Sequence, residues 1–145
     1  MKIHHHKFTV TDMDRSLLFY RDLLGFELIY DAERSNLPSY DTIMGYTDVK
    51  LRVSMLRDSF GSVLALIQYH NPEVQIRRQA NYFQGSSQIC LQTDDIDADY
   101  ERLTRAGVAS RSQPVNIIRD GMAVARACYI LDPDDIAIEL YQPLL

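Results

Sequence analysis

The sequence predicts an α+β fold in which two βαβββ modules form a single domain. The main observation is an internal repeat, because residues 9–25 and 92–107 each run from an alternating segment, through an Asp, into an amphipathic helix closed by Gly. Asp12 aligns with Asp95, 83 residues later in a chain of 145. A repeat that long is half of a pseudo-symmetric domain, since a solenoid repeat would be far shorter. Two similar halves facing each other would create a cleft, where a binding site is expected.

The first predicted strand covers residues 3–10, in which β-branched and aromatic side chains alternate. If Phe8 and Val10 face a helix, the two-residue period of a strand places His6 with them. The same period turns His4 away from His5. Three residues are expected on the opposite face: His5, Lys7 and Thr9.

A helix follows, for which Asp12 is a suitable N-cap and Gly25 a suitable end. Its apolar residues recur at spacings of three and four: Met13, Leu17, Tyr20 and Leu24. Residues 26–32 return as a strand, and residues 35–46 are expected to form a polar loop. Residues 50–56 and 62–69 predict a hairpin whose turn uses Gly61 at positive φ.

The second half repeats this order. Asp95 caps a helix that carries Ile96, Tyr100 and Leu103 and ends at Gly107. The predicted strands of this half cover residues 88–93, 108–112, 122–131 and 136–141. We therefore expect one domain with module 1 at residues 1–70, a polar linker at 71–87 and module 2 at 88–145.

Composition excludes several classes of function. Twenty acidic and 15 basic residues give a net charge of −5, which argues against nucleic acid or an anionic membrane as the main partner. No apolar run is long enough to span a membrane or to form the core of a signal peptide. Two cysteines are too few for a disulfide framework. We expect a protein with reduced thiols in the cytoplasm.

Three motifs in order resemble the vicinal oxygen chelate superfamily, which includes glyoxalase I, methylmalonyl-CoA epimerase, extradiol dioxygenases and bleomycin- or fosfomycin-resistance proteins. The motifs are His5 with Val10, Asp12, Ser16, Phe19-Tyr20 and Leu24-Gly25-Phe26; Asp94-Asp95-Ile96-Asp97 with Leu103 and Ala106-Gly107-Val108; and Asp132-Pro133-Asp134 with Ile138-Glu139-Leu140. The resemblance covers nearly the whole chain. It implies that the two modules form a curved mixed sheet around a cleft.

The resemblance also implies a metal site with one ligand on the first strand and one on the last strand of each module. These four places fall on His5, Ala65, Gln88 and Glu139. His5 and Gln88 each stand seven residues before the helix-capping Asp, so the repeat aligns them. Ala65 has no donor atom, and the implied metal ligands are therefore His5, Gln88 and Glu139.

Two functions remain open at this point. An imidazole, an amide oxygen and a carboxylate suit a divalent ion such as Zn, Ni, Mn or Fe(II). In the superfamily such an ion stabilises enediolate-like intermediates, and Glu139 could stay bound or act as the catalytic base. This interpretation predicts a metal-dependent lyase, isomerase or epimerase. Alternatively, the cleft holds no metal and sequesters a small aromatic compound or drug, as bleomycin-resistance proteins do.

The residues that share a strand face with the ligand positions are candidates for binding the small molecule. They are Lys7, Ile67, Tyr69, Cys90, Gln92 and Tyr141, with Thr9 and Ala137 beside them. The alternative is that most of them pack within the sheet or at a dimer contact. We expect a small-molecule ligand and a homodimer.

Overall fold

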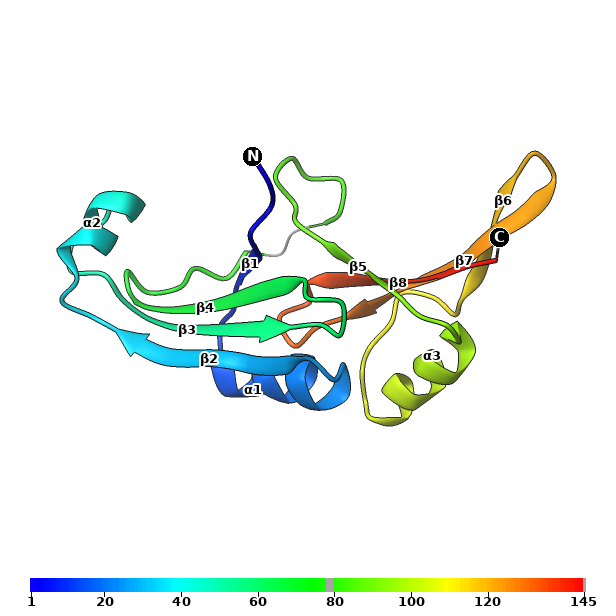
Figure 1. Ribbon diagram of the computed structural model, residues 1–145, viewed down its shortest axis with the longest axis horizontal. Helices are drawn as coiled ribbons and strands as arrows, with labels where there is room; N and C mark the ends of the chain where they lie inside the picture. The colour runs from blue at the N-terminus through cyan, green and yellow to red at the C-terminus, as the bar shows by residue number, and fades with distance from the viewer. Residues whose placement is uncertain (78–79, 145) are drawn as a thin grey trace. The chain divides into compact units, whose positions relative to one another are not determined.

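The computed structural model describes residues 1–77 and 80–144, and the chain divides into two compact units, Met1–Arg77 and Arg78–Leu145. Each unit contains a four-stranded mixed sheet with a helix packed on one face (Figure 1). The predicted α+β class with two βαβββ modules is confirmed. No helix among the described residues is long and apolar enough to cross a membrane.

The first unit has the strand order β1-β4-β3-β2. β1 pairs in parallel with β4, and the other pairs are antiparallel. Its elements are β1 (His6–Thr9), α1 (Met13–Leu17), η1 (Leu18–Leu23), β2 (Glu27–Arg34), α2 (Pro38–Met44), β3 (Lys50–Arg57) and β4 (Val63–Asn71).

The helix predicted after Asp12 forms, but its second half is wider than an α-helix. Asp12 Oδ1 accepts a hydrogen bond from Arg15 N at 3.0 Å, as an N-cap does. η1 is a π-helical turn, closed by a hydrogen bond from Leu24 N to Phe19 O at 2.9 Å. Because the wider turn changes which residues face the sheet, both Phe19 and Tyr20 are buried, while Leu24 is only half-buried.

The polar loop predicted at residues 35–46 is wrong, because it contains α2. Pro38 stands at the first helical position, where its fixed φ favours a helix, and Gly45 ends the helix at φ +73°. Tyr40 and Met44 pack against a cluster made of Val49, Leu51 and Ile67. Two apolar contacts at a spacing of four residues thus stabilise a helix in an otherwise polar segment.

The second unit has the strand order β5-β8-β7-β6, with β5 parallel to β8 and the other pairs antiparallel. Its elements are β5 (Ile89–Gln92), α3 (Ile96–Arg105), β6 (Val115–Arg119), β7 (Met122–Leu131) and β8 (Ala137–Pro143).

The strand predicted at residues 108–112 is also wrong. Only Ser110 forms a bridge there, to Ile130, and the edge strand that pairs with β7 is β6. The β6–β7 hairpin turns at Asp120-Gly121, where both residues have positive φ (50° and 79°). An Asp-Gly pair is a strong hairpin signal, so the sequence did contain the information that places this strand.

The two units repeat individual side-chain contacts as well as strand order. Gln68 Oε1 in β4 accepts a hydrogen bond from Met13 N at 2.9 Å, and Gln142 Oε1 in β8 accepts one from Ile96 N at 3.4 Å. Each glutamine therefore ties the last strand of its unit to the first residue of the helix that packs on it.

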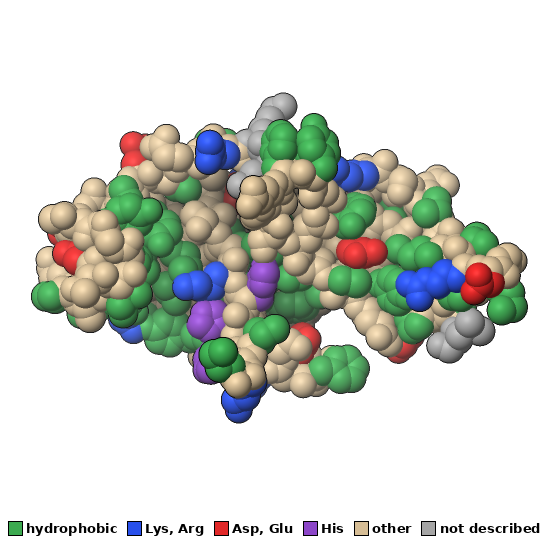
Figure 2. Space-filling view, turned by 90° about the horizontal axis from the view of Figure 1, so that it is seen from above, with side chains coloured by type: hydrophobic (Ala, Val, Ile, Leu, Met, Phe, Trp, Pro, Cys, Tyr) green, Lys and Arg blue, Asp and Glu red, His purple; other side chains and the backbone are tan. Residues whose placement is uncertain are grey.

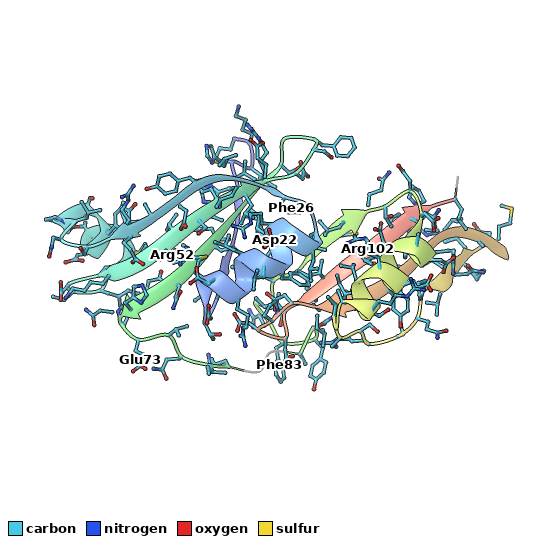
Figure 3. The ribbon with its side chains drawn as sticks, turned by 90° about the horizontal axis from the view of Figure 1, so that it is seen from below. Asp22, Phe26, Arg52, Glu73, Phe83 and Arg102 are labelled. Atoms are coloured by element: carbon cyan, nitrogen blue, oxygen red, sulfur yellow. The ribbon has the colours of Figure 1, made fainter. Side chains whose placement is uncertain are left out.

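An Arg–Asp ion pair is repeated in the same way. Arg52 in β3, which is labelled in Figure 3, pairs with Asp14 in α1 at 2.7 Å, and Arg126 in β7 pairs with Asp97 in α3. Arg52 makes a second pair with Asp31 in β2, also at 2.7 Å. The first unit thus links its helix to two strands through one guanidinium.

The turn before the last strand is the third repeated feature. Asp58 Oδ1 accepts hydrogen bonds from Phe60 N at 2.9 Å and Ser62 N at 2.8 Å. Asp132 Oδ1 accepts the equivalent two bonds, from Asp134 N and Ile136 N, both at 2.8 Å. Gly61 and Asp135 hold the same place in these turns, at φ +92° and +62°.

Candidate active site

Strand register gives Ala65 and Glu139 the same place in their respective units. In the first unit Lys7 lies opposite Ala65, and in the second Cys90 lies opposite Glu139. His5 and Gln88 stand two residues before Lys7 and Cys90 and come immediately before β1 and β5. The alignment of these positions, predicted from the repeat and the motifs, agrees with the hydrogen-bonded register of each sheet.

In the second unit, Glu139 is the centre of a row of polar side chains that crosses three strands. Cys90 in β5 lies opposite Glu139 in β8, and Tyr129 in β7 lies opposite it on the other side. Directly opposed residues point to the same face of a sheet, so the three side chains are neighbours.

The surroundings of this row favour the neutral thiol and the neutral phenol. Burial, followed by the charge and hydrogen bond of Glu139, raises the pKa of Cys90 to about 11. Cys90 nevertheless retains exposed surface. Burial also raises the pKa of Tyr129, with Glu139 and Cys90 adding to the effect, while a hydrogen bond with Asn81 opposes it.

Sequence reasoning missed Tyr129, although the Asp132 turn contained the necessary signal. Asp132 N donates to Ile136 O at 3.0 Å, and this bond fixes the register of the β7–β8 hairpin. Counting back along both strands from that pair places Tyr129 opposite Glu139.

The corresponding row in the first unit is Lys7, Ala65 and Met55. Lys7 is exposed and Ala65 is 3% exposed. A cation, a methyl group and a thioether offer no oxygen or nitrogen lone pair to a metal ion at neutral pH. His5 is therefore the one donor of the first unit among the four predicted ligand positions.

His5 is half-buried and contacts His4. Its Nδ1 lies 2.9 Å from His4 Nδ1, and the two rings meet edge to face with centroids 5.1 Å apart. The prediction that alternation turns His4 away was wrong, because β1 begins only at His6. His6 packs edge to face on Phe8 at 4.9 Å, on the helix side, as expected. Histidine side chains gather beside a cationic side chain in Figure 2.

The protonation state of His5 suits a metal ligand. Burial, and then the positive charges of His4 and Lys7, lower the pKa of His5 below 6.5. The imidazole is therefore mainly neutral at pH 7, which is the form that binds metals.

The residues predicted to bind a small molecule fall into two groups. Ile67 is 7% exposed and belongs to the cluster of Val49, Leu51 and Ile67, against which Tyr69 and α2 pack. Tyr69 Oη donates a hydrogen bond to Met44 Sδ in α2 at 3.6 Å. In the second unit Gln92 lies opposite Tyr141, two residues along each strand from Cys90 and Glu139 and on the same face. The first group is thus covered by α2, whereas the second group keeps exposed surface.

The donor set fits the chemistry of a divalent ion in part. In neither unit do three His, Cys, Asp or Glu side chains of the described residues gather as a metal-binding group. The predicted positions still supply a neutral imidazole, a carboxylate and an amide oxygen, which are ligand types that Zn²⁺ and similar ions accept. The ligand types therefore fit a metal, with one donor fewer than the full set.

Comparison with known proteins identifies relatives over the whole chain. The family model described as the Glyoxalase/Bleomycin resistance protein/Dioxygenase superfamily matches residues 2–140. A 2-epi-5-epi-valiolone epimerase from an Actinomyces species is 27% identical over 141 residues, which are 95% of this chain and 77% of that protein. A probable lactoylglutathione lyase from Vibrio cholerae is 27% identical over 143 residues, covering 97% of this chain and 90% of the other.

Solved structures show the same fold. A glyoxalase family protein from Bacillus cereus superposes with a TM-score of 0.86 at 20% identity, covering 100% of this chain and 95% of that one. At this identity, the similarity supports the fold and not an activity.

Proposed function

The chain belongs to the Glyoxalase/Bleomycin resistance protein/Dioxygenase superfamily, and on this premise we propose that it is a divergent metal-dependent lyase, isomerase or epimerase. Its substrate would be a small oxygenated molecule with a carbonyl group. The observation that carries the proposal is Glu139, which keeps a carboxylate at the last-strand position where Ala65 has lost it. The proposed metal donors are His5, Gln88 and Glu139.

Each residue has a defined role in this proposal. A divalent ion, when bound, polarises a substrate carbonyl and lowers the pKa of the neighbouring C–H group. Glu139 accepts the carbon-bound proton on a carboxylate oxygen and returns it, on the same carbon or the adjacent one. Gln92 and Tyr141 form the pair two residues along the strands from Glu139, on the same face of the sheet, and can hydrogen-bond the substrate's oxygens. Lys7 is the proposed binding residue for a negatively charged substrate group.

Solvent exchange tests the proposed reaction across a range of candidate substrates. The zinc-loaded protein is incubated in D₂O with a panel of small α-hydroxy ketones and 2-oxo acids, and proton NMR follows loss of the C–H signal beside the carbonyl. We expect protein-dependent exchange for at least one compound. Glu139→Gln should abolish it, and Glu101→Gln, which changes an exposed acid on α3, should not. Equal exchange in both variants would exclude Glu139 as the base.

A second candidate function is metal-free binding of a small aromatic or apolar compound. The observation that favours it is Ala65, which puts a methyl group at the first-unit position where the second unit has the Glu139 carboxylate, and so removes a charge that would repel an apolar ligand. A thermal-shift screen of aromatic compounds in the presence and absence of EDTA separates the two functions. Stabilisation that EDTA leaves unchanged supports sequestration, and stabilisation that EDTA removes supports the metal-dependent enzyme.

We also propose that the chain acts as a homodimer. Native mass spectrometry at micromolar concentration reports the subunit number directly. A monomer at all concentrations would reject this part of the proposal.

A further inference from the structure

We propose that Arg34, which lies over the ring of Tyr30, binds an anionic group of the ligand, a carboxylate or a phosphate, on the Ala65 face of the first unit. This inference rests on the proposed function for the ligand being a substrate, and it adds the class of that substrate: an acid with an apolar body. The site lies entirely within the first unit.

Strand register places Arg34 and Tyr30 on the same face of the sheet as Ala65. Tyr30 lies opposite Met55, and Met55 lies opposite Ala65. Arg34 comes four residues after Tyr30 in β2, an even spacing that keeps both on one face, and lies opposite Leu51. α1 packs on the opposite face.

Arg34 is a half-buried cation whose charge has no ion-pair partner in the part of the chain that the structure describes. Two other described arginines are half-buried, and both are in ion pairs. Arg52 pairs with Asp31 at 2.7 Å, and Arg126 pairs with Asp97. Because withdrawal of a charged side chain from water favours a partner of opposite charge, Arg34 is suited to an anion from outside the chain.

The acidic side chains of β2 and α2 have partners of their own. Glu33 contacts His70 at 3.2 Å, and Glu27 pairs with Arg57 at 2.7 Å. Asp31 is in the ion pair described above. The one acid of α2 accepts backbone hydrogen bonds on both carboxylate oxygens, at 3.0 and 2.9 Å. Within the described residues, these two elements therefore leave no acid to neutralise the stacked guanidinium.

The contact with Tyr30 orients the guanidinium of Arg34. Arg34 Cζ lies 5.2 Å from the centre of the Tyr30 ring, which is a cation–π distance. Nη1 donates a hydrogen bond to Glu33 O at 3.3 Å. The planar guanidinium has five N–H donors, so Nε and Nη2 can make two parallel hydrogen bonds to a carboxylate or phosphate.

Apolar side chains beside the guanidinium provide a surface for the rest of the ligand. Met55 lies between Tyr30 and Ala65 in one row, and Val53 stands two residues before it on the same face. Met55 and Val53 are half-buried, so both keep surface that a ligand can cover. A thioether packs well on rings and alkyl chains. An aromatic or alkyl group joined to the acidic group therefore fits this face.

Lys7, which the proposed function assigns to a negatively charged group, lies at the other end of this row. Three strand spacings of about 4.8 Å, or roughly 14 Å, separate β1 from β2. One carboxylate or phosphate therefore contacts either Lys7 or Arg34, and a short acid distinguishes the two cations.

Calorimetric titration of the full chain in EDTA, at constant ionic strength, tests the inference with three probes: 3-phenylpropionate, phenyl phosphate and the neutral 3-phenylpropan-1-ol. We expect each acid to bind at least about 10-fold more tightly than the alcohol, because hydrogen bonds to charged groups are stronger. The tighter acid identifies the preferred anionic group. In methyl NMR, the Met55 signal should shift on binding, and the signal of Met122 in the second unit should not.

Arg34→Met removes the charge and keeps a side chain of similar shape. It should weaken binding of both acids at least about 10-fold and leave binding of the alcohol unchanged. Arg57→Met is the matched control, because it removes one positive charge from the same face, where Glu27 already pairs with it. It should keep the affinity for the acids. Far-ultraviolet circular dichroism checks that each variant is folded.

The inference is wrong if neither acid binds more tightly than the alcohol, or if Arg34→Met and Arg57→Met weaken binding equally. It is also wrong if Lys7→Met weakens binding and Arg34→Met does not. Because these titrations contain no free metal ion, such results leave the proposed metal-dependent reaction untouched. Anion binding through Arg34 in a protein that never binds zinc would support the Arg34 site and reject the metal-dependent function.

Discussion

Replacing Ala65 with Glu restores a carboxylate at the position where the first unit has lost one. Ala65 is 3% exposed, in the central strand β4, with Lys7 and Met55 as its neighbours on either side. The larger side chain should cost about 1–3 kcal/mol through overpacking. An ionised carboxylate in this place would cost roughly several kcal/mol more, so without metal the group is expected to stay protonated at neutral pH.

The expected destabilisation depends on pH with a definite sign. Burial raises the pKa of the new carboxyl in the folded protein above its value of about 4.3 in the unfolded chain. Below that value both states are protonated and only the overpacking cost remains. As pH rises, the unfolded state ionises first, so the free energy of unfolding falls. At pH 7, about 2.7 units above the unfolded pKa, keeping the group protonated costs about 3.7 kcal/mol at about 1.36 kcal/mol per unit, so we expect a total loss of about 5–7 kcal/mol from the two effects together.

Zinc should reverse part of this loss if residue 65 is a ligand position. A ligand present at 100 times its dissociation constant stabilises the folded state by about 2.7 kcal/mol. Urea unfolding at about pH 5 and pH 8, with and without zinc, measures the effect. Ala65→Gln serves as a control that has the same size without the charge. The reasoning is refuted if zinc stabilises Ala65→Glu no more than Ala65→Gln.

Two further predictions concern the repeated contacts. Asp132→Ala should lower the free energy of unfolding by about 3 kcal/mol, because it removes two hydrogen bonds to a carboxylate that is 4% exposed. Asp58→Ala, in the more exposed turn, should lower it by about 1 kcal/mol. Equal losses in urea unfolding would contradict this prediction. Arg52 lowers the pKa of Asp31 in the folded protein below its unfolded value of 3.8. This pair therefore stabilises the fold fully above pH 3.8, and the stabilisation is lost as the pH falls through the lower folded pKa. Arg52→Met should therefore flatten the acid side of the stability profile below about pH 4, and an unchanged slope would show that the pair does not act as described.

Local chemistry made the duplicated elements predictable from the sequence. Asp12 and Asp95 cap their helices, and Gly61 takes the predicted positive φ, because each of these features depends on a few neighbouring residues. Glu139 and Ala65 could be aligned because motif and repeat agree with strand register.

The features that sequence reasoning missed depend on contacts that are distant in the chain. α2 is stabilised by Tyr40 and Met44 packing on Leu51 and Ile67, in strands that come later in the sequence. The contact between His4 and His5 depends on where pairing of β1 with β4 begins. Tyr129 becomes a neighbour of Glu139 only when the register of an antiparallel pair is known.

The metal content of the protein tests the central claim most directly. The chain is loaded with zinc, separated from free ions, and examined by native mass spectrometry and elemental analysis, beside Glu139→Gln and the control Glu101→Gln. We predict one ion per chain in the wild-type protein and in Glu101→Gln, and a clear loss in Glu139→Gln. The account is contradicted if the wild-type chain binds no ion, or if Glu139→Gln retains it in full.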